Sequence, residues 1–125
     1  LPERITKLLN NDWHVEIDVW FLDGKIFLGH DKPEHEVELS FLKHDKLWCH
    51  AKNLEALQIM LNNDIHCFWH EQDERTLTSK GFIWTYPDKD VGEKSIIVCT
   101  TPEETEKFSK MKIAGVCSDY LKEIK

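Results

Sequence analysis

Two carboxylates placed two residues apart, with a histidine and an aspartate further on, are the residues of this chain best suited to chemistry. Side chains alternate along a strand, so Glu16 and Asp18 share one face of the apolar segment 15–20. Two negative charges this close repel each other, and a divalent cation would neutralise both. His30 and Asp31 follow after a turn and a second short apolar run. The pattern predicts a metal site beside a titratable imidazole, and a solvent-facing strand with scattered charges remains the alternative.

Polar or reactive residues also end most of the other strand-like segments. In parallel α/β barrels, the C-terminal ends of the strands build the active site. A solvated loop explains any one of these ends, but their repetition favours a shared mouth. The residues concerned are His30-Asp31, His50 and Lys52, His70-Glu71, Thr85-Tyr86, Thr100-Thr101 and Ser118-Asp119.

Segments rich in Val, Ile, Phe, Trp or Cys and bounded by polar residues, Gly or Pro predict strands. They span residues 14–21, 25–29, 46–51, 65–70, 81–86, 95–100 and 113–118. Helices are predicted over 2–11, after an N-cap at Asn53, and after an N-cap at Thr101 that Pro102 and a capping-box glutamate follow. Residues 40–44 predict a single turn, and the polar segment 71–80 predicts a loop.

Alternation of strands and helices is typical of a parallel sheet. We therefore expect residues 1–125 to form one domain, a small TIM-type (β/α) barrel with reduced helices. Barrels of this type have eight strands and commonly ~250 residues. Only the segments above are available in 125 residues. Either an eighth strand precedes residue 1 or the barrel is open on that side, and several crossover helices are expected to be shortened to loops.

Charge, apolar content and cysteine spacing argue against several classes of protein. Lys and Arg number 16 against 23 Asp and Glu, a formal net charge of −7 that disfavours binding to nucleic acid. No apolar run approaches the ~20 residues that span a bilayer. Cys49, Cys67, Cys99 and Cys117 form no Cys-x-x-Cys pair. We interpret them as buried, reduced thiols of a cytoplasmic protein.

Motifs along most of the chain resemble the glycerophosphodiester phosphodiesterase family, barrel enzymes related to phosphatidylinositol-specific phospholipase C. The first of these motifs is fairly specific and the others support it. The matching residues are Glu16-x-Asp18-Val19 with Asp23-Gly24, His30-Asp31, Trp48-Cys49-His50-Ala51-Lys52, Ile83-Trp84-Thr85 and Gly115-Val116-Cys117-Ser118-Asp119-Tyr120.

The chain departs from the family in two places that bear on catalysis. The family's first strand ends in His-Arg-Gly and supplies one of two catalytic histidines. Residues 1–12 resemble the helix that follows that strand, so we expect the strand itself to be missing from this chain. His50 stands where the family has a third carboxylate ligand. Imidazole still coordinates divalent ions but shifts the preference toward softer transition metals.

The resemblance implies metal-dependent hydrolysis of a phosphodiester by acid/base histidine catalysis. Glu16, Asp18 and His50 would hold the divalent cation, Mg²⁺ or Ca²⁺ in the first place and Mn²⁺ as a further candidate. His30 would protonate the departing alkoxide as a general acid, with Asp31 fixing its tautomer.

Further residues are predicted to contact the substrate, a small phosphodiester. They are Lys52, His70, Trp84 and Tyr86. Each also has an ordinary explanation as a surface, loop or core residue. Because the second catalytic histidine has no counterpart, a noncatalytic phosphate- or sugar-binding domain that keeps the pocket remains the alternative. The sequence leaves the oligomeric state open.

Overall fold

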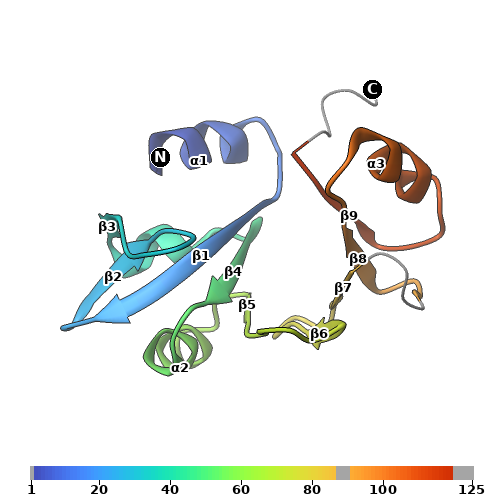
Figure 1. The fold of residues 1–125 in the computed structure, drawn as a ribbon. Coiled ribbons are helices and arrows are strands. Elements are labelled where there is room, and N and C mark those ends of the chain that lie inside the picture. The colour runs from blue at the N-terminus through green and yellow to red at the C-terminus, as the bar shows by residue number, and fades with distance from the viewer. Residues whose placement is uncertain (1, 87–90, 120–125) are drawn as a thin grey trace. The chain divides into compact units, whose positions relative to one another are not determined.

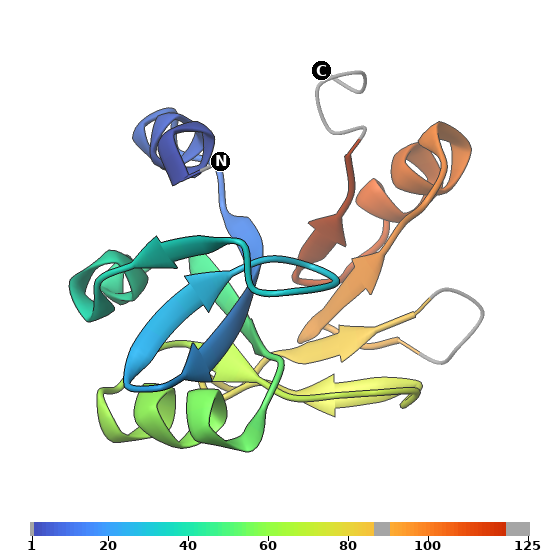
Figure 2. The same ribbon diagram turned by 60° about the vertical axis from the view of Figure 1, so that its left-hand side comes forward.

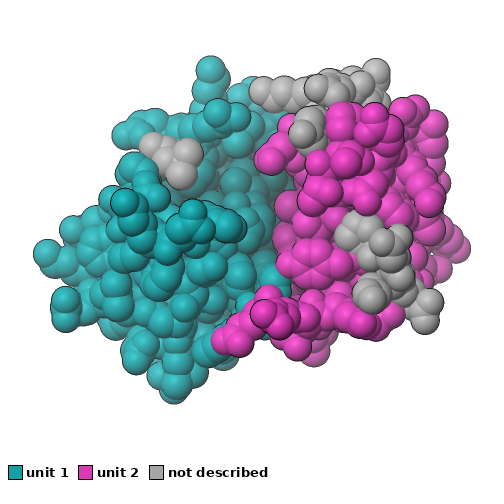
Figure 3. Space-filling model, viewed as in Figure 1, with its two compact units in different colours: residues 1–70 teal, residues 71–125 magenta. Residues whose placement is uncertain are grey.

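Residues 2–86 and 91–119 are described in the computed structural model of this chain. Their contacts divide the chain into two compact units, residues 1–70 and residues 71–125, which Figure 3 shows in teal and magenta. Each unit has its own sheet. Tyr120, the last residue of the final sequence motif, lies outside the described residues.

Unit 1 contains a mixed sheet of five strands in the order β3-β2-β1-β4-β5 (Figure 1). Three strands at one side of this order, β1, β4 and β5, run parallel, whereas β2 and β3 pair antiparallel. The bounds are β1 (Val15–Leu22), β2 (Lys25–Leu28), β3 (His35–Val37), β4 (Leu47–Ala51) and β5 (Cys67–Phe68).

A tight hairpin joins the first two strands, as the sequence predicts. Asp23 and Gly24 adopt φ values of 52° and 76°. Two left-handed residues in succession make the type of turn whose twist matches antiparallel strands, and Asp-Gly is a favoured sequence for it. Figure 2 shows β2 returning beside β1, with Val19 opposite Leu28.

One face of this sheet is covered by α1 (Pro2–Asn10), the 3₁₀ turn η1 (Leu39–Lys43) and α2 (Leu54–Asn62). Asn53 caps α2, because its Oδ1 accepts from the Ala56 N–H at 3.0 Å. Strand alternation sends Ile17, Val19 and Cys49 to this face, where they join a buried core. The even-numbered side chains of β1 and β4 therefore lie on the opposite face.

Unit 2 contains a four-stranded sheet in the order β6-β7-β8-β9, with only β6 antiparallel. Thr101 caps α3 (Pro102–Ser109) by accepting from the Glu104 N–H, while Glu104 accepts from the Thr100 N–H. The predicted helix start is confirmed. The strands are β6 (Arg75–Leu77), β7 (Ile83–Thr85), β8 (Ser95–Val98) and β9 (Gly115–Cys117).

The prediction of a TIM-type barrel is wrong. The described strands form two mixed sheets rather than one closed sheet, and three helices are too few for a ring around a barrel. Part of the difference between the predicted barrel and the observed sheets arises in segment 71–80, which was predicted to be a loop. This segment contains β6, an antiparallel strand that pairs with β7, where a barrel would need a crossover to a further parallel strand. Of the helices described, none has the length and apolar character that a membrane crossing requires.

Candidate metal centre

Two neighbouring parallel strands bring together the three residues predicted to bind metal. Glu16 and Asp18 are two residues apart on β1, so their side chains share the face opposite the core. The register of β1 with β4 pairs Asp18 with His50. Among the described residues, Glu16, Asp18 and His50 form one group whose ligand atoms all lie within 4.8 Å of one another.

Distances within the group suit a shared cation. His50 Nδ1 lies 3.0 Å from Asp18 Oδ1 and 3.9 Å from Glu16 Oε2. Two donors each ~2.1 Å from an ion lie ~3 Å apart at a right angle and at most ~4.2 Å apart. The side chains of Asp18 and His50 are only 10% and 12% exposed. The donor set and its spacing therefore fit a divalent ion.

The two carboxyl groups are electrostatically unfavourable without a cation. Burial raises the pKa of Glu16 to about 8, and the negative charge of Asp18 and a hydrogen bond between the two groups add to this shift. Lys52 acts in the opposite direction through its positive charge. Glu16 therefore keeps a proton at neutral pH in the metal-free protein, and a divalent ion would take that proton's place.

His50 is held by contacts from the edge of the sheet. Its Nε2 lies 3.1 Å from the backbone carbonyl oxygen of His70. The ring of His50 is nearly parallel to those of Phe68 and His70, with centroids 5.2 and 4.5 Å away. These contacts leave Nδ1 of His50 directed at the two carboxylates. His70, a predicted site residue, contacts His50 and is not itself one of the three grouped residues.

Lys52 follows β4 directly, and its backbone N–H donates to Val19 at 2.8 Å. Alternation places it on the same face as His50. Its effect on the pKa of Glu16 gives it an electrostatic connection with the acidic pair. The structure therefore places the positive charge of Lys52 near the acidic pair, and its contact with substrate stays a prediction.

His30 is not one of the grouped ligands. Its Nδ1 lies 2.9 Å from Asp31 Oδ1, the contact predicted to fix its tautomer, and its side chain is 81% exposed. The loop that carries His30 begins at Gly29. The N–H of Gly29 donates to the backbone carbonyl of Asp18, and its carbonyl accepts from the Trp20 indole at 2.7 Å. A Cβ at Gly29 would lie 1.9 Å from the Lys32 carbonyl oxygen, so this close turn needs glycine.

Trp84 and Tyr86, predicted to contact substrate, belong to unit 2. Trp84 is 5% exposed on β7, and Tyr86 is half-buried just after it. Burial agrees with the alternative explanation of Trp84 as a core residue. Their assignment to the substrate site remains a prediction.

A neighbouring row of side chains on the same face was missed by sequence reasoning. The Trp48 indole donates to His14 Nδ1 at 2.9 Å, and its ring centroid lies 4.3 Å from that of His66. Burial and the charges of Lys46 and His44 lower the pKa of His14, which favours the neutral, accepting imidazole. Parity was the available signal, because even-numbered positions of β1 and β4 share this face.

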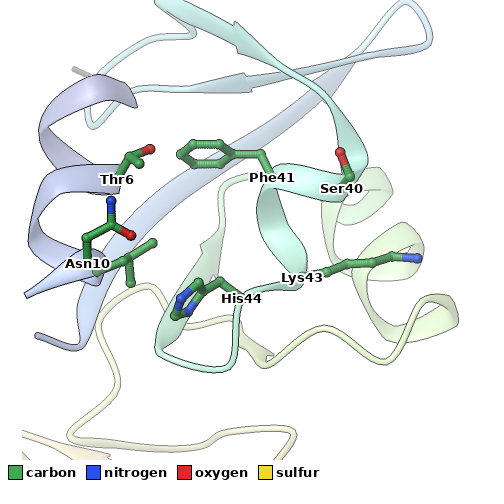
Figure 4. A pocket seen from close by; sticks show the side chains of 7 residues that line it. Thr6, Asn10, Ser40, Phe41, Lys43 and His44 are labelled. Atoms are coloured by element: carbon green, nitrogen blue, oxygen red, sulfur yellow. The ribbon is translucent and has the colours of Figure 1, made fainter. Parts of the chain in front are cut away.

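A separate hollow of about 320 Å³ lies between α1 and η1 (Figure 4). None of the three grouped ligands lines it. Thr6 and the ring of Phe41 point toward each other, and Lys43 extends away. The lining residues are Thr6, Leu9, Asn10, Ser40, Phe41, Lys43 and His44.

All four cysteines are free thiols, and three of them, Cys49, Cys67 and Cys99, are buried. Burial raises the pKa of the Cys49 thiol, so it stays protonated on the core face of the sheet. The cysteines contribute no ligand to the group described above.

Comparison with protein-family models, curated proteins and solved structures gives no match to this chain. The chemistry of Glu16, Asp18 and His50 is therefore argued from their own geometry.

Proposed function

We propose that this chain is a metal-dependent phosphodiester hydrolase acting on a small diester of the glycerophosphodiester kind. The convergence of Glu16, Asp18 and His50 on a cation-sized space is the observation that supports the proposal. The motifs along the chain resemble, in order, those of a family of phosphodiesterases, and this resemblance is the reason for proposing diester hydrolysis as the reaction. A cytoplasmic location is part of the proposal, and the four free cysteines are compatible with it.

The chemistry of a phosphodiester explains why such a site would be useful. The negative charge of the diester repels nucleophiles, and a divalent ion, when bound, polarises the phosphoryl oxygen and offsets that charge. Glu16, Asp18 and His50 would hold and orient the ion. Lys52 adds a positive charge on the same face, suited to a second phosphoryl oxygen.

Water would attack the phosphorus as the bond to the alcohol oxygen breaks, and the leaving alkoxide needs a proton, for which His30 is the proposed donor. The proton that the water loses passes to solvent, from which His30 regains its own. Asp31 contacts Nδ1 of His30, which leaves Nε2 to face the substrate. A positioned general acid contributes typically ~10²–10⁴-fold to the rate.

A noncatalytic phosphate- or sugar-binding domain is the second candidate. The exposure of His30 and its absence from the grouped ligands favour this candidate. Such a domain would bind the ion and the phosphate ester without turning the ester over.

Hydrolysis of bis(p-nitrophenyl) phosphate with Mg²⁺, Ca²⁺ or Mn²⁺ separates the two candidates. We expect metal-dependent release of p-nitrophenol. Loss of a metal ligand should lower the rate of hydrolysis about 100-fold or more. Removing a group that only supports a ligand already lowers activity by up to about 100-fold. Glu16→Gln and Asp18→Asn should therefore abolish most of the activity while the fold, followed by circular dichroism, is kept.

Glu36→Gln is the matched control, because Glu36 is an exposed glutamate on β3 outside the grouped ligands. It should keep full activity. No release of p-nitrophenol with any of the ions, together with retained metal binding, would support the binding domain instead.

A further inference from the structure

The donor set of this site is mixed, and this bears on which ion it selects. Ca²⁺ and Mg²⁺ are hard cations that take oxygen ligands in nearly all protein sites. Imidazole nitrogen suits borderline first-row transition ions, and affinity for a given site generally rises from Mn²⁺ through Co²⁺ toward Cu²⁺. Here the third donor beside Glu16 and Asp18 is the imidazole of His50.

The hydrogen bonding of His50 determines which nitrogen is available. A carbonyl oxygen can only accept, so the 3.1 Å contact with His70 places the hydrogen on Nε2. Nδ1 lies 3.0 Å from Asp18 Oδ1, a contact that needs a hydrogen between the two atoms while no ion is bound. A divalent ion would displace that hydrogen, and the imidazole would then present its Nδ1 lone pair to the ion. Metal-binding histidines characteristically donate a hydrogen bond from the N–H of their second ring nitrogen to a carbonyl or carboxylate in this way.

Ring contacts hold the same orientation. The planes of His50 and Phe68 differ by 5°, and those of His50 and His70 by 6°. Phe68 is 2% exposed and lies opposite His50 in the register of β4 with β5. Rotation of the imidazole would break the bond to the carbonyl of His70 and these parallel ring contacts together. Nδ1 is therefore fixed before an ion arrives.

We propose that this site selects a borderline transition dication of the Mn²⁺, Co²⁺ and Zn²⁺ class over Mg²⁺ and Ca²⁺, with His50 Nδ1 as its nitrogen ligand. The carbonyl of His70 and the ring of Phe68 act as positioning groups. The inference builds on the proposed function, since it concerns the same site, but it is tested by metal binding without any turnover.

Calorimetric titration of the metal-free full chain with Zn²⁺, Co²⁺, Mn²⁺, Mg²⁺ and Ca²⁺ tests the selectivity. We expect Zn²⁺ and Co²⁺ to bind at least ~100-fold more tightly than Mg²⁺ or Ca²⁺. Equal affinity for Mg²⁺ and Co²⁺, or no binding of any ion, would overturn the proposal.

His50→Glu replaces the nitrogen donor with oxygen at the same position. The ratio of Co²⁺ to Mg²⁺ affinity should fall at least ~10-fold, and the visible absorption bands of the Co²⁺ complex should change. His35→Gln, at a half-buried histidine of β3 outside the grouped ligands, is the control and should change neither. An unchanged affinity ratio in folded His50→Glu would contradict the ligand assignment.

Positioning has its own readouts. Long-range proton–nitrogen correlation spectra of the Zn²⁺-loaded wild type should show hydrogen on Nε2 and none on Nδ1 of His50. Phe68→Leu should weaken Co²⁺ binding about 10-fold and alter its absorption bands, the size expected for a supporting group. Hydrogen on Nδ1 in the loaded protein would overturn the proposal even if every variant misfolded.

The two proposals fail in different ways. Selective Zn²⁺ or Co²⁺ binding without diester hydrolysis would contradict the proposed function and support the metal assignment. Hydrolysis that Mg²⁺ or Ca²⁺ supports at equal affinity would support the function and contradict the metal assignment.

Discussion

Glu16 and Asp18 interact unfavourably in the absence of a cation, and this gives them a measurable effect on stability. The pKa of Glu16 is raised from 4.5 to about 8 by burial, by the charge of Asp18 and by their hydrogen bond. The other groups facing it are His50 and Lys52. The folded protein therefore holds a proton on Glu16 over a pH range in which the unfolded chain has released it.

Stability should consequently fall as pH rises through this range. The contribution of Glu16 is fully present below pH 4.5 and is lost as pH approaches and passes about 8. The slope for one proton is at most about 1.4 kcal/mol per pH unit. Urea unfolding in EDTA between pH 5 and 8.5 should show the decline in wild type and a weaker one in Glu16→Gln. Parallel curves for the two proteins, with Glu36→Gln as reference, would show that Glu16 is not the responsible group.

The proposed role of His30 predicts that the effect of its loss on the rate depends on the leaving group. If its imidazole protonates the departing alkoxide, His30→Ala should slow poor leaving groups by ~10²-fold or more and p-nitrophenolate far less. Metal affinity should be unchanged, because His30 is not among the grouped ligands. A series of aryl and alkyl diesters gives the measurement, and equal losses across the series would remove the general-acid role.

At the scale of elements, Asn53 connects the helix behind the sheet to the strand that carries the acids. Its Oδ1 accepts from Ala56 at the start of α2, and its amide exchanges two hydrogen bonds with the backbone of Phe21 in β1. The sequence predicted the cap, because Asn precedes an apolar helical stripe. The bonds to Phe21 join residues 32 apart, and no local pattern could indicate them.

Asn53→Ala should destabilise the protein by about 2–3 kcal/mol, from the cap and the two strand bonds together. Asn53→Asp keeps the acceptor that caps α2 and loses the donor to Phe21, so about half of that loss is expected. Urea unfolding midpoints give both values. An alanine variant within about 0.5 kcal/mol of wild type would show that the junction contributes little.

Short edge strands show where element prediction failed. β3 and β6 have three residues each, and Leu77 of β6 is 72% exposed. Neither contains a fully buried residue or an apolar alternation, so pairing with a neighbour decides their conformation. By contrast, β1, β2 and β4 have a buried face, and their predicted bounds agree with the structure to within one residue at each end.

The grouping of Glu16, Asp18 and His50 was predictable for a related reason. Strand parity placed Glu16 and Asp18 on one face, and His50 was identified as the residue at the position of a third ligand. The contribution of Phe68 and the orientation of His50 by the carbonyl of His70 depend on the pairing of β4 with β5. A sequence gives no strand register for residues 18 positions apart, such as His50 and Phe68.

For the whole molecule, local strand signals did not determine how the strands assemble. Seven of the nine described strands were recognised, but closure of a barrel depends on each edge strand pairing with the next. β5 has only two residues, and the following β6 turns back to pair with β7. The described strands consequently form two sheets, in units of residues 1–70 and 71–125.

The division into two units predicts which strands metal binding stabilises. Ligand binding stabilises the part of a protein that unfolds together with the site. All three ligands lie in residues 1–70, so Co²⁺ should slow amide hydrogen exchange in β1, β4 and β5 and leave β8 and β9 unchanged. Equal slowing in β8 and β9 would instead indicate that residues 1–125 unfold as the single domain expected from the sequence.

A crystal of the protein soaked in Zn²⁺ or Mn²⁺ provides the most direct measurement. We expect an anomalous peak from an ion bound by a carboxylate oxygen of Glu16, a carboxylate oxygen of Asp18 and Nδ1 of His50, each ~2.0–2.2 Å from the ion for Zn²⁺. A fully occupied ion elsewhere, or a soaked crystal with no peak between these three side chains, would contradict it.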